Sequence, residues 1–310
     1  VLAVNSGYSD EGDTSVGGEA VISLKEPKIV VAADEGVTQE SYGSLWWTFD
    51  RYGIKFSPMT IASIRGGGLR GMNVLILPEG NASRYMSSFG AGGVSALKEF
   101  ASSGGTIVTI SGASVFAALK DVGLTSTKLV GSDDDEQKSK ADDSKDAKPS
   151  PSPSASPKPE PTPADLGTER KERVSQSLPP IASPSANANK VPEALPGSIM
   201  RATVDRTTYL NYGVNQDEVP VLLASGYFFR YSKEGANALV FDAEPRSPLT
   251  ISGFVWEGNT ERLLKGTSYV IDESNGSGHV ILFAEDPFFR GMTRGMTRPF
   301  FNSILFNGVF

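Results

Sequence analysis

Val74-Leu75-Ile76-Leu77-Pro78 decides the fold of this chain, because four successive apolar residues without alternation predict a strand that is buried on both faces. Thr106–Ile110 has the same character, and amphipathic helices are predicted at 41–52 and 94–101. Further strands are predicted at Ile29–Ala33 and from Ile54, and a further helix from Ser114. Strands that alternate with helices indicate a parallel sheet covered on both faces.

The second half of the chain is richer in strands. Neither half alone contains a complete sheet with a closing helix, so the two halves are predicted to form one domain. The predicted fold class is an α/β sandwich with a mostly parallel central sheet and extra strands in its second half. These strands are expected at 219–223, 238–241, 269–271 and 279–283, and a final helix at 299–310.

A long low-complexity segment separates the two halves. From residue 132 the chain turns into charge clusters, and it then carries proline–serine repeats with most of its 20 prolines. Such a segment buries too little apolar surface to offset its ordering entropy, so we expect a disordered insertion. The expected organisation is an N-terminal extension or the end of a preceding domain at 1–27, a first part at 28–131, an insertion at 132–195 and a second part at 196–310.

The composition excludes several classes of function. The formal charge of −7 argues against nucleic acid as a partner, and the absence of cysteine excludes disulfides and thiolate–metal sites. No stretch approaches the roughly 18 apolar residues that a membrane-spanning helix needs. Val1–Val4 is typical of the middle of a strand, so the chain is expected to be a fragment of an exported, periplasmic or extracellular bacterial protein whose signal peptide lies elsewhere.

Several motifs resemble class I glutamine amidotransferase-like domains. Leu77–Gly80 and Ser111–Ser114 occur in the order of that family's leucine–proline–glycine turn and nucleophile elbow. Pro196–Arg201, Ser252–Trp256 and Gly278–Arg290 resemble the amidotransferase-like region that follows the catalytic domain of large bacterial zinc carboxypeptidases of the carboxypeptidase A superfamily. The resemblance implies a flavodoxin-like fold and a zinc metallocarboxypeptidase as the parent protein.

The triad of the amidotransferase family is incomplete here. The resemblance places Ser111 at the cysteine position of the elbow and Ala284 at the histidine position. The single histidine, His279, lies five residues before Ala284, about 16 Å away along an extended strand. We therefore expect no amidotransferase catalysis, a structural role for His279, and a turn or helix-capping role for Ser111. A hydrolase that pairs Ser111 with a carboxylate base is the most distant alternative.

Metal and nucleotide chemistry are not expected in this chain. The carboxypeptidase A superfamily holds zinc with two histidines and a glutamate, which one histidine cannot supply. No cofactor is therefore expected, and zinc is assigned to the absent upstream peptidase domain. Arg65–Gly71 contains a formal G-x-G-x-x-G, but it precedes a strand instead of following one, so we expect a turn.

Charged residues are expected to gather where the parallel strands end, the usual ligand site of this architecture. The candidates are Glu79, Glu285 and Asp286, joined by the arginines Arg84, Arg290, Arg294 and Arg298. They are expected to form an ion-pair network that fixes loops, a pocket for a ligand, or a surface that faces the peptidase domain.

An aromatic surface is also expected. Trp46 and Trp47 are adjacent, so at least one is predicted in the core and the other at an interdomain or self-association surface. The repeat Gly291–Arg298 is a further candidate interface.

The sequence thus predicts a non-catalytic, amidotransferase-like accessory domain of a bacterial zinc carboxypeptidase. Its expected partners are the upstream peptidase domain of the same polypeptide and a second copy of the chain, and its role is packing on that domain, regulating it or supporting oligomerisation. The alternative is a module that binds a sugar or a peptide through the strand-end carboxylates and arginines.

Overall fold

The computed structural model describes residues 7–8, 15, 18, 21, 23–33, 36–132, 190–306 and 309. Residues 133–189, which make up nearly all of the predicted insertion, lie outside the described residues. So does most of the predicted N-terminal extension at 1–27.

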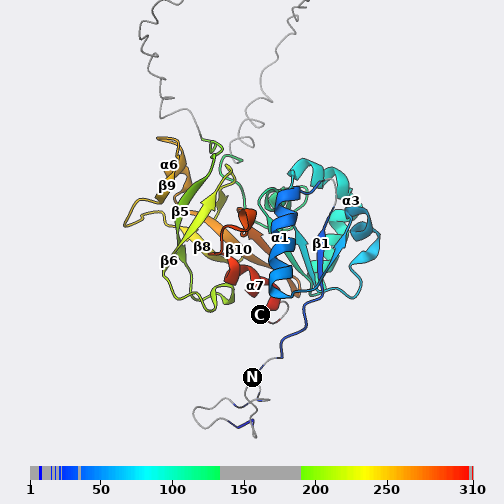
Figure 1. Cartoon of the computed structure of the whole chain (residues 1–310). Helices are drawn as coiled ribbons and strands as arrows, with labels where there is room; N and C mark the ends of the chain where they lie inside the picture. Colours follow the sequence, from blue (N-terminus) through cyan, green and yellow to red (C-terminus); the bar gives the residue numbers. More distant parts are fainter. Residues whose placement is uncertain are drawn as a thin grey trace, which may run out of the picture.

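Five parallel strands form one half of the sheet (Figure 1), in the order β2-β1-β3-β4-β11. This is the 2-1-3-4-5 order of flavodoxin-like folds, so the predicted fold class is confirmed. Almost every residue of the inner strands is buried, as expected for strands covered on both faces. The strands are β1 (Ile29–Ala32), β2 (Phe56–Met59), β3 (Val74–Leu77), β4 (Thr106–Ile110) and β11 (Gly278–Phe283).

The same sheet continues through antiparallel strands from the second half of the chain, in the order β11-β10-β8-β5-β6. In addition, β7 pairs with β10 and β9 pairs with β5. Strand β5 alternates buried and half-buried residues, the pattern of a sheet with one open face. These strands are β5 (Ser198–Val204), β6 (Glu218–Leu223), β7 (Phe229–Arg230), β8 (Ala236–Phe241), β9 (Thr250–Gly253) and β10 (Thr267–Asn275).

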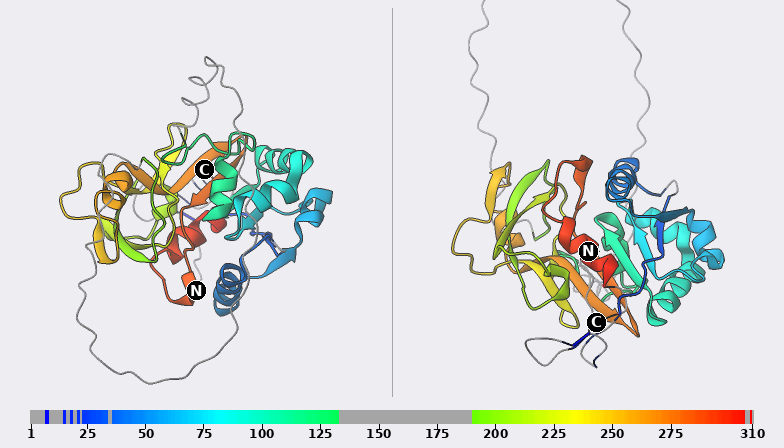
Figure 2. Two further views of the ribbon diagram at one scale, coloured as in Figure 1. Left: turned by 90° about the horizontal axis from the view of Figure 1, so that it is seen from above. Right: turned by 60° about the horizontal axis from the view of Figure 1, so that its bottom comes forward.

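Helices cover both faces of the parallel half (Figure 2). Helices α1 (Gln39–Tyr52) and α7 (Thr297–Leu305) lie on one face, and α3 (Ala82–Ser102) and α4 (Gly112–Ala118) lie on the other. Helix α1 ends at Gly53, whose left-handed conformation lets its N–H donate to the carbonyls of the last turn. The short elements are α2 (Ile61–Ser63), the π-helical turn η1 (Ile64–Gly68), η2 (Tyr209–Asn211), α6 (Thr260–Leu264) and η3 (Phe289–Gly291).

Some boundaries differ from the sequence-based expectations. Helix α3 begins at Ala82, well before the expected residue 94, because Asn81 caps it by accepting a hydrogen bond from the Arg84 N–H at 3.0 Å. Gly90 interrupts this helix with a φ of 56°, which masked the continuous pattern in the sequence. Strands β5 and β9 were not predicted, because neither contains a continuous apolar run. Polar residues interrupt β5, which begins at Ser198, and β9 has four residues and ends at Gly253.

Aromatic packing joins α1 to α7 across the two halves of the chain. The Phe49 ring of α1 lies 6.2 Å from Phe300 and 6.3 Å from Phe301 of α7, between ring centroids. The expectation that one tryptophan of the Trp46–Trp47 pair lies in the core was wrong, since their exposed fractions are 58% and 44%. Leu45 and Phe49 fill the buried face of α1 instead, so both indole rings remain at the surface.

The turn after β3 lies against the first residue of α4. A Cβ atom added to Gly112 would overlap the carbonyl oxygen of Gly80. Backbone carbonyls cannot move aside as flexible side chains do, so only glycine fits at position 112.

We predict that Gly112→Ala lowers the free energy of unfolding by about 3 kcal/mol, because the added methyl group separates α4 from the β3 turn. Urea unfolding measures the change. The matched control is Gly92→Ala in α3, where nothing lies within 4 Å of the added atom. That substitution should be neutral or stabilise by about 0.5–1 kcal/mol. An equal loss in both variants would contradict the close approach.

Candidate functional site

Ser111 lies at the tight turn between β4 and α4, in the place of a nucleophile elbow. Its φ of 51° and ψ of −114° form a strained backbone that a non-glycine residue rarely adopts. The side chain is only 1% exposed, and its Oγ has no hydrogen-bond partner. Ser111 thus occupies the turn and the N-cap position of α4, as expected, but its hydroxyl caps no N–H of that helix.

The register of β4 and β11 decides what faces this elbow. Ile110 pairs with Phe283, and the Ser111 N–H donates to the Phe283 carbonyl at 2.8 Å, so the residue that follows β11 lies next to Ser111 in register. That residue is Ala284, which is 2% exposed and donates its N–H to the Tyr269 carbonyl. An alanine side chain has no lone pair that could accept a proton, so this position supplies Ser111 with no base.

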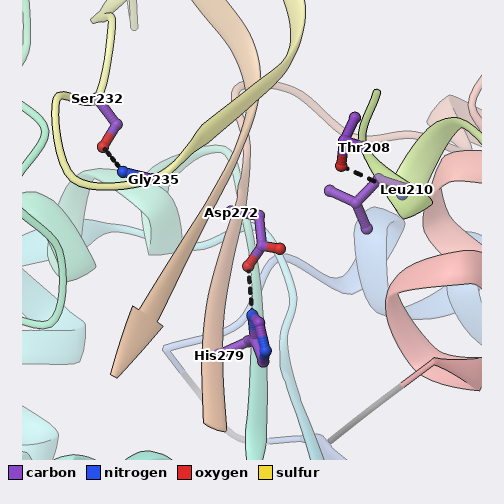
Figure 3. A network of polar contacts seen from close by, with 6 residues as sticks. All are labelled: Thr208, Leu210, Ser232, Gly235, Asp272 and His279. Atoms are coloured by element: carbon purple, nitrogen blue, oxygen red, sulfur yellow. Dashed lines mark hydrogen bonds and ion pairs between the residues drawn. The ribbon is translucent and has the colours of Figure 1, made fainter. Parts of the chain in front are cut away.

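The single histidine lies at the opposite end of β11, where it pairs in register with Thr106 at the start of β4. Figure 3 shows His279 against Asp272, with Nδ1 2.9 Å from the carboxylate Oδ1. Asp272 also accepts a hydrogen bond from the Tyr209 hydroxyl, whose pKa is raised by burial and by that carboxylate. His279 and Asp272 are both buried and line a cavity of about 280 Å³. His279 thus orders the β10–β11 hairpin, far from the elbow.

Three of the predicted carboxylates do gather at the carboxyl ends of the strands. Glu79 follows β3, and Glu285 and Asp286 follow β11. Glu285 and Asp286 are buried, whereas Glu79 is half-buried. Burial raises the pKa of Glu79, and the nearby Asp286 charge raises that pKa further. The three carboxyl groups are therefore close enough to influence one another's protonation.

Burial dominates the protonation of this carboxylate cluster, which is Glu79, Glu285 and Asp286. Burial away from water raises the pKa of Glu285 to about 7. Hydrogen bonds from the Ser225 hydroxyl and the Ala224 N–H lower this pKa, but by less than burial raises it, and the Glu79 charge adds a smaller increase. Burial likewise raises the pKa of Asp286 to about 6. The carboxylate cluster therefore gains protons at pH values where ordinary carboxyl groups are fully ionised.

Hydroxyl groups that the sequence did not single out bind the carboxylate cluster to its surroundings. Ser41 of α1 accepts a hydrogen bond from the Glu79 N–H at 3.2 Å, and its side chain is also hydrogen-bonded to Asp286. Ser225 donates its hydroxyl to Glu285 at 2.5 Å. Both serines are distant in sequence from their partners, so no motif spacing marks them.

The predicted arginines lie in different places. Arg84 lies exposed in the first turn of α3, and Arg290 lies exposed with its guanidinium 5.2 Å from the centroid of the neighbouring Phe289 ring. The charges that raise the pKa values of Glu79 and Glu285 are those of other carboxylates. Arg294, another of the predicted arginines, shares a cavity of about 300 Å³ with Asp286.

The described residues contain neither a candidate metal site nor a candidate membrane-spanning helix. Within these ranges, no three His, Cys, Asp or Glu side chains are grouped so that they could hold a metal ion. No helix among them is both long enough and apolar enough to cross a bilayer. The turn at Ile64–Gly68 precedes β3, as expected from the sequence.

No protein-family model and no curated protein matches this chain. Similar solved structures include a ThuA-like protein from Bacteroides uniformis, with 10% identity, a TM-score of 0.48, and coverage of 94% of this chain and 96% of that chain. A glutamine amidotransferase from Thermotoga maritima has 8% identity and a TM-score of 0.46, with coverage of 92% and 99%. A GMP synthase subunit from Thermoplasma acidophilum has 10% identity and a TM-score of 0.46, with coverage of 90% and 94%. At these values, the assignment of the fold rests on the strand order.

We predict that Ser111→Gly raises the free energy of unfolding by about 1 kcal/mol, because glycine adopts a positive φ without strain. Ser111→Ala is the matched variant, since it removes the unpartnered hydroxyl but keeps the Cβ atom. It should give a smaller gain than glycine. Urea unfolding of the three proteins tests this, and a loss of stability in Ser111→Gly would contradict a strained elbow.

We predict that the stability of the protein falls as pH rises from about 4.5 to about 7, because the folded state holds the Glu285 proton in this window and the unfolded chain releases it. Glu285→Gln keeps the acceptor oxygen without the charge. It should raise the free energy of unfolding by on the order of 2 kcal/mol at pH 8 and leave it unchanged at pH 4.

Urea unfolding at the two pH values provides the measurement. The control is Glu99→Gln, an exposed carboxylate of α3, which should change stability by less than about 0.5 kcal/mol at either pH. An equal gain for Glu285→Gln at pH 4 and pH 8 would show that protonation is not the cause.

Proposed function

We propose that this chain is a non-catalytic, amidotransferase-like accessory domain. The observation that carries the proposal is the register that places Ala284 beside Ser111. A serine attacks a carbonyl only when an adjacent base accepts its proton. The elbow here keeps the strained backbone of a nucleophile turn but has no such base.

The nearby carboxylates do not replace the missing histidine. Glu285 has a pKa near neutrality, which suits a general base, but one of its oxygens is held by Ser225 and the Ala224 N–H. Ser111 Oγ forms no hydrogen bond with it or with any other described group. Ser111 and Ala284 are also both buried, which supports a role in packing.

The role that we propose for the domain is to pack against a zinc carboxypeptidase domain of the same polypeptide, as the motif resemblance implies. The supporting observation is that α1 exposes two adjacent tryptophans, Trp46 and Trp47, and that Met292 follows Gly291, which lies against the Trp47 ring. The exposed fractions of Trp46, Trp47 and Met292 are 58%, 44% and 78%, and we call these three side chains the aromatic face. Large apolar side chains that gather on a surface mark protein interfaces in soluble proteins.

Trp47 packs against two neighbours. The Gly291 backbone lies against its ring, so that a Cβ atom added there would come within about 3.3 Å of it, and the Arg51 guanidinium lies 5.5 Å from the ring centroid. A side chain that is already restrained loses little conformational entropy on binding, which suits a permanent domain interface. Self-association through the same face is the competing use.

A second candidate function is favoured by the cavity that Asp286 and Arg294 share. Its volume of about 300 Å³ and its opposite charges fit a small polar ligand such as a sugar or the end of a peptide. In that case Asp286→Asn and Arg294→Gln would each weaken binding of the ligand, measured by calorimetry with a panel of sugars and dipeptides. No saturable binding by the wild-type chain would remove this candidate.

Two measurements test the main proposal. Labelling with a fluorophosphonate probe should leave Ser111 unmodified, and turnover of amide and ester substrates should equal that of Ser111→Ala. Modification of Ser111, or turnover lost in Ser111→Ala, would overturn the non-catalytic assignment.

The packing role is tested in the longest natural polypeptide that contains this sequence, because the proposed partner domain must be present. Hydrogen exchange of Gln39–Tyr52 should be slower there than in the isolated chain, and Trp46→Ser should restore fast exchange. The matched control is Phe254→Ser, an equally exposed aromatic residue in the antiparallel half. Absence of zinc-dependent carboxypeptidase activity in that polypeptide would contradict the proposed parent, and concentration-dependent protection of the isolated chain would favour self-association.

A further inference from the structure

The repeated sequence before α7 brings two arginines to one cavity. Gly291–Arg298 contains Gly-Met-Thr-Arg twice, and the arginines of the two copies, Arg294 and Arg298, both line a cavity of about 620 Å³. The Thr297 N–H donates to the Arg294 carbonyl at 3.1 Å, which forms a turn between the two arginines. We call this cavity the arginine cavity.

The other walls of the arginine cavity come from segments that lie far from this repeat in the sequence. Tyr52 is the last residue of α1, and residues 213–216 and 218–220 belong to the loop before β6 and to β6 itself. Gln216 and Thr297 add neutral groups that can donate hydrogen bonds. The volume of the cavity lies within the range of sites that bind small molecules.

The acidic residues beside the arginine cavity are paired with other arginines. Among the described residues that line it, the only carboxylate is Glu218, whose Oε2 lies 3.0 Å from the Arg201 guanidinium. The preceding residue, Asp217, lies 2.9 Å from the Arg206 guanidinium. No carboxylate of the described residues lies within ion-pair distance of either arginine of the cavity. Both of those guanidinium groups are therefore available to a ligand.

We propose that the arginine cavity binds the phosphate or carboxylate group of a small organic anion. A guanidinium group presents N–H donors in one plane that match the paired oxygens of these groups, and two guanidinium groups in one cavity can bind a single anion together. The chain as a whole carries a formal charge of −7 and repels anions, so binding would come from this local pair. The inference does not depend on the accessory role proposed for the domain.

The arginine cavity is distinct from the cavity that Arg294 shares with Asp286. Arg298 lines the arginine cavity but not the other one, and Asp286 lines the other but not the arginine cavity. Asp286 also accepts a hydrogen bond from the Phe288 N–H at 2.8 Å. Single variants therefore separate the two sites. Arg298→Gln should weaken anion binding, whereas Asp286→Asn should not.

The experiment is a calorimetric titration of the full chain with glycerol phosphate and with citrate, at low and high salt, and with glycerol as the uncharged counterpart. We expect saturable binding of at least one of the two anions, weakening as salt rises, and no binding of glycerol. The affinity should be at least about 10-fold lower in the double variant Arg294→Gln and Arg298→Gln.

The matched control is the double variant Arg70→Gln and Arg246→Gln. It removes the same charge from two exposed arginines that do not line the arginine cavity. Its affinity should stay within about two-fold of the wild type.

Binding of one anion alone supports the site and identifies the charged group that it prefers. The proposal is overturned if neither anion binds saturably at low salt, if the Arg294 and Arg298 variant binds as well as the wild type, or if the control variant loses as much affinity. A loss in Asp286→Asn with none in Arg298→Gln would assign the binding to the other cavity and overturn the proposal as well. Arg294 and Arg298 are exposed, so we expect the double variant to fold. If its thermal unfolding shows that it does not, Arg298→Gln alone gives the same comparison with a smaller loss.

Discussion

The pairing of β4 with β11 is the constraint on which the rest of the structure depends. Thr106–Ile110 and His279–Phe283 run in parallel although 169 or more residues separate them in the chain. Side chains strengthen the contact, since the Ser114 hydroxyl donates to the Phe283 carbonyl at 2.8 Å and also lies 2.9 Å from the Thr109 hydroxyl. Such a long loop is closed at a modest entropic cost, because that cost grows only with the logarithm of length.

This pairing fixes the backbone of the turn at Ser111. The backbone of Ser111 is fixed by its N–H bond to β11, and α4 is fixed by the close approach of Gly112 to Gly80. These are backbone contacts, so they do not depend on which side chain lies next to Ser111. The side chain at position 284 is therefore not needed for the fold, whereas the glycine at position 112 is.

The two halves of the sheet present different surfaces. The parallel half carries the aromatic face of α1 and the carboxylate cluster at its strand ends, and the antiparallel half carries a cavity lined in part by Arg230 and Arg262. The β11 loop links the two halves, because Glu285 accepts hydrogen bonds from the loop after β6, and Asp286 is hydrogen-bonded to Ser41 of α1. A change in the protonation of Glu285 or Asp286 therefore alters hydrogen bonds that hold the two halves together.

The sequence by itself determined the strand–helix alternation and the burial of Val74–Leu77 and Thr106–Ile110. These features are local, because apolar periodicity and residue identity need no knowledge of distant partners. It also placed Glu79, Glu285 and Asp286 at strand ends. It did not place both tryptophans at the surface, because adjacent positions on a helix leave open which face the sheet covers.

Only the tertiary structure decided which residues meet. The contacts of Glu285 with Ser225, of Asp286 with Ser41, and of His279 with Asp272 depend on strand register and on loops that no sequence pattern specifies. The convergence of Arg230 and Arg262 on one cavity has the same origin. Secondary structure follows from neighbours along the chain, whereas a site follows from the register of strands brought together by the burial of the whole sheet.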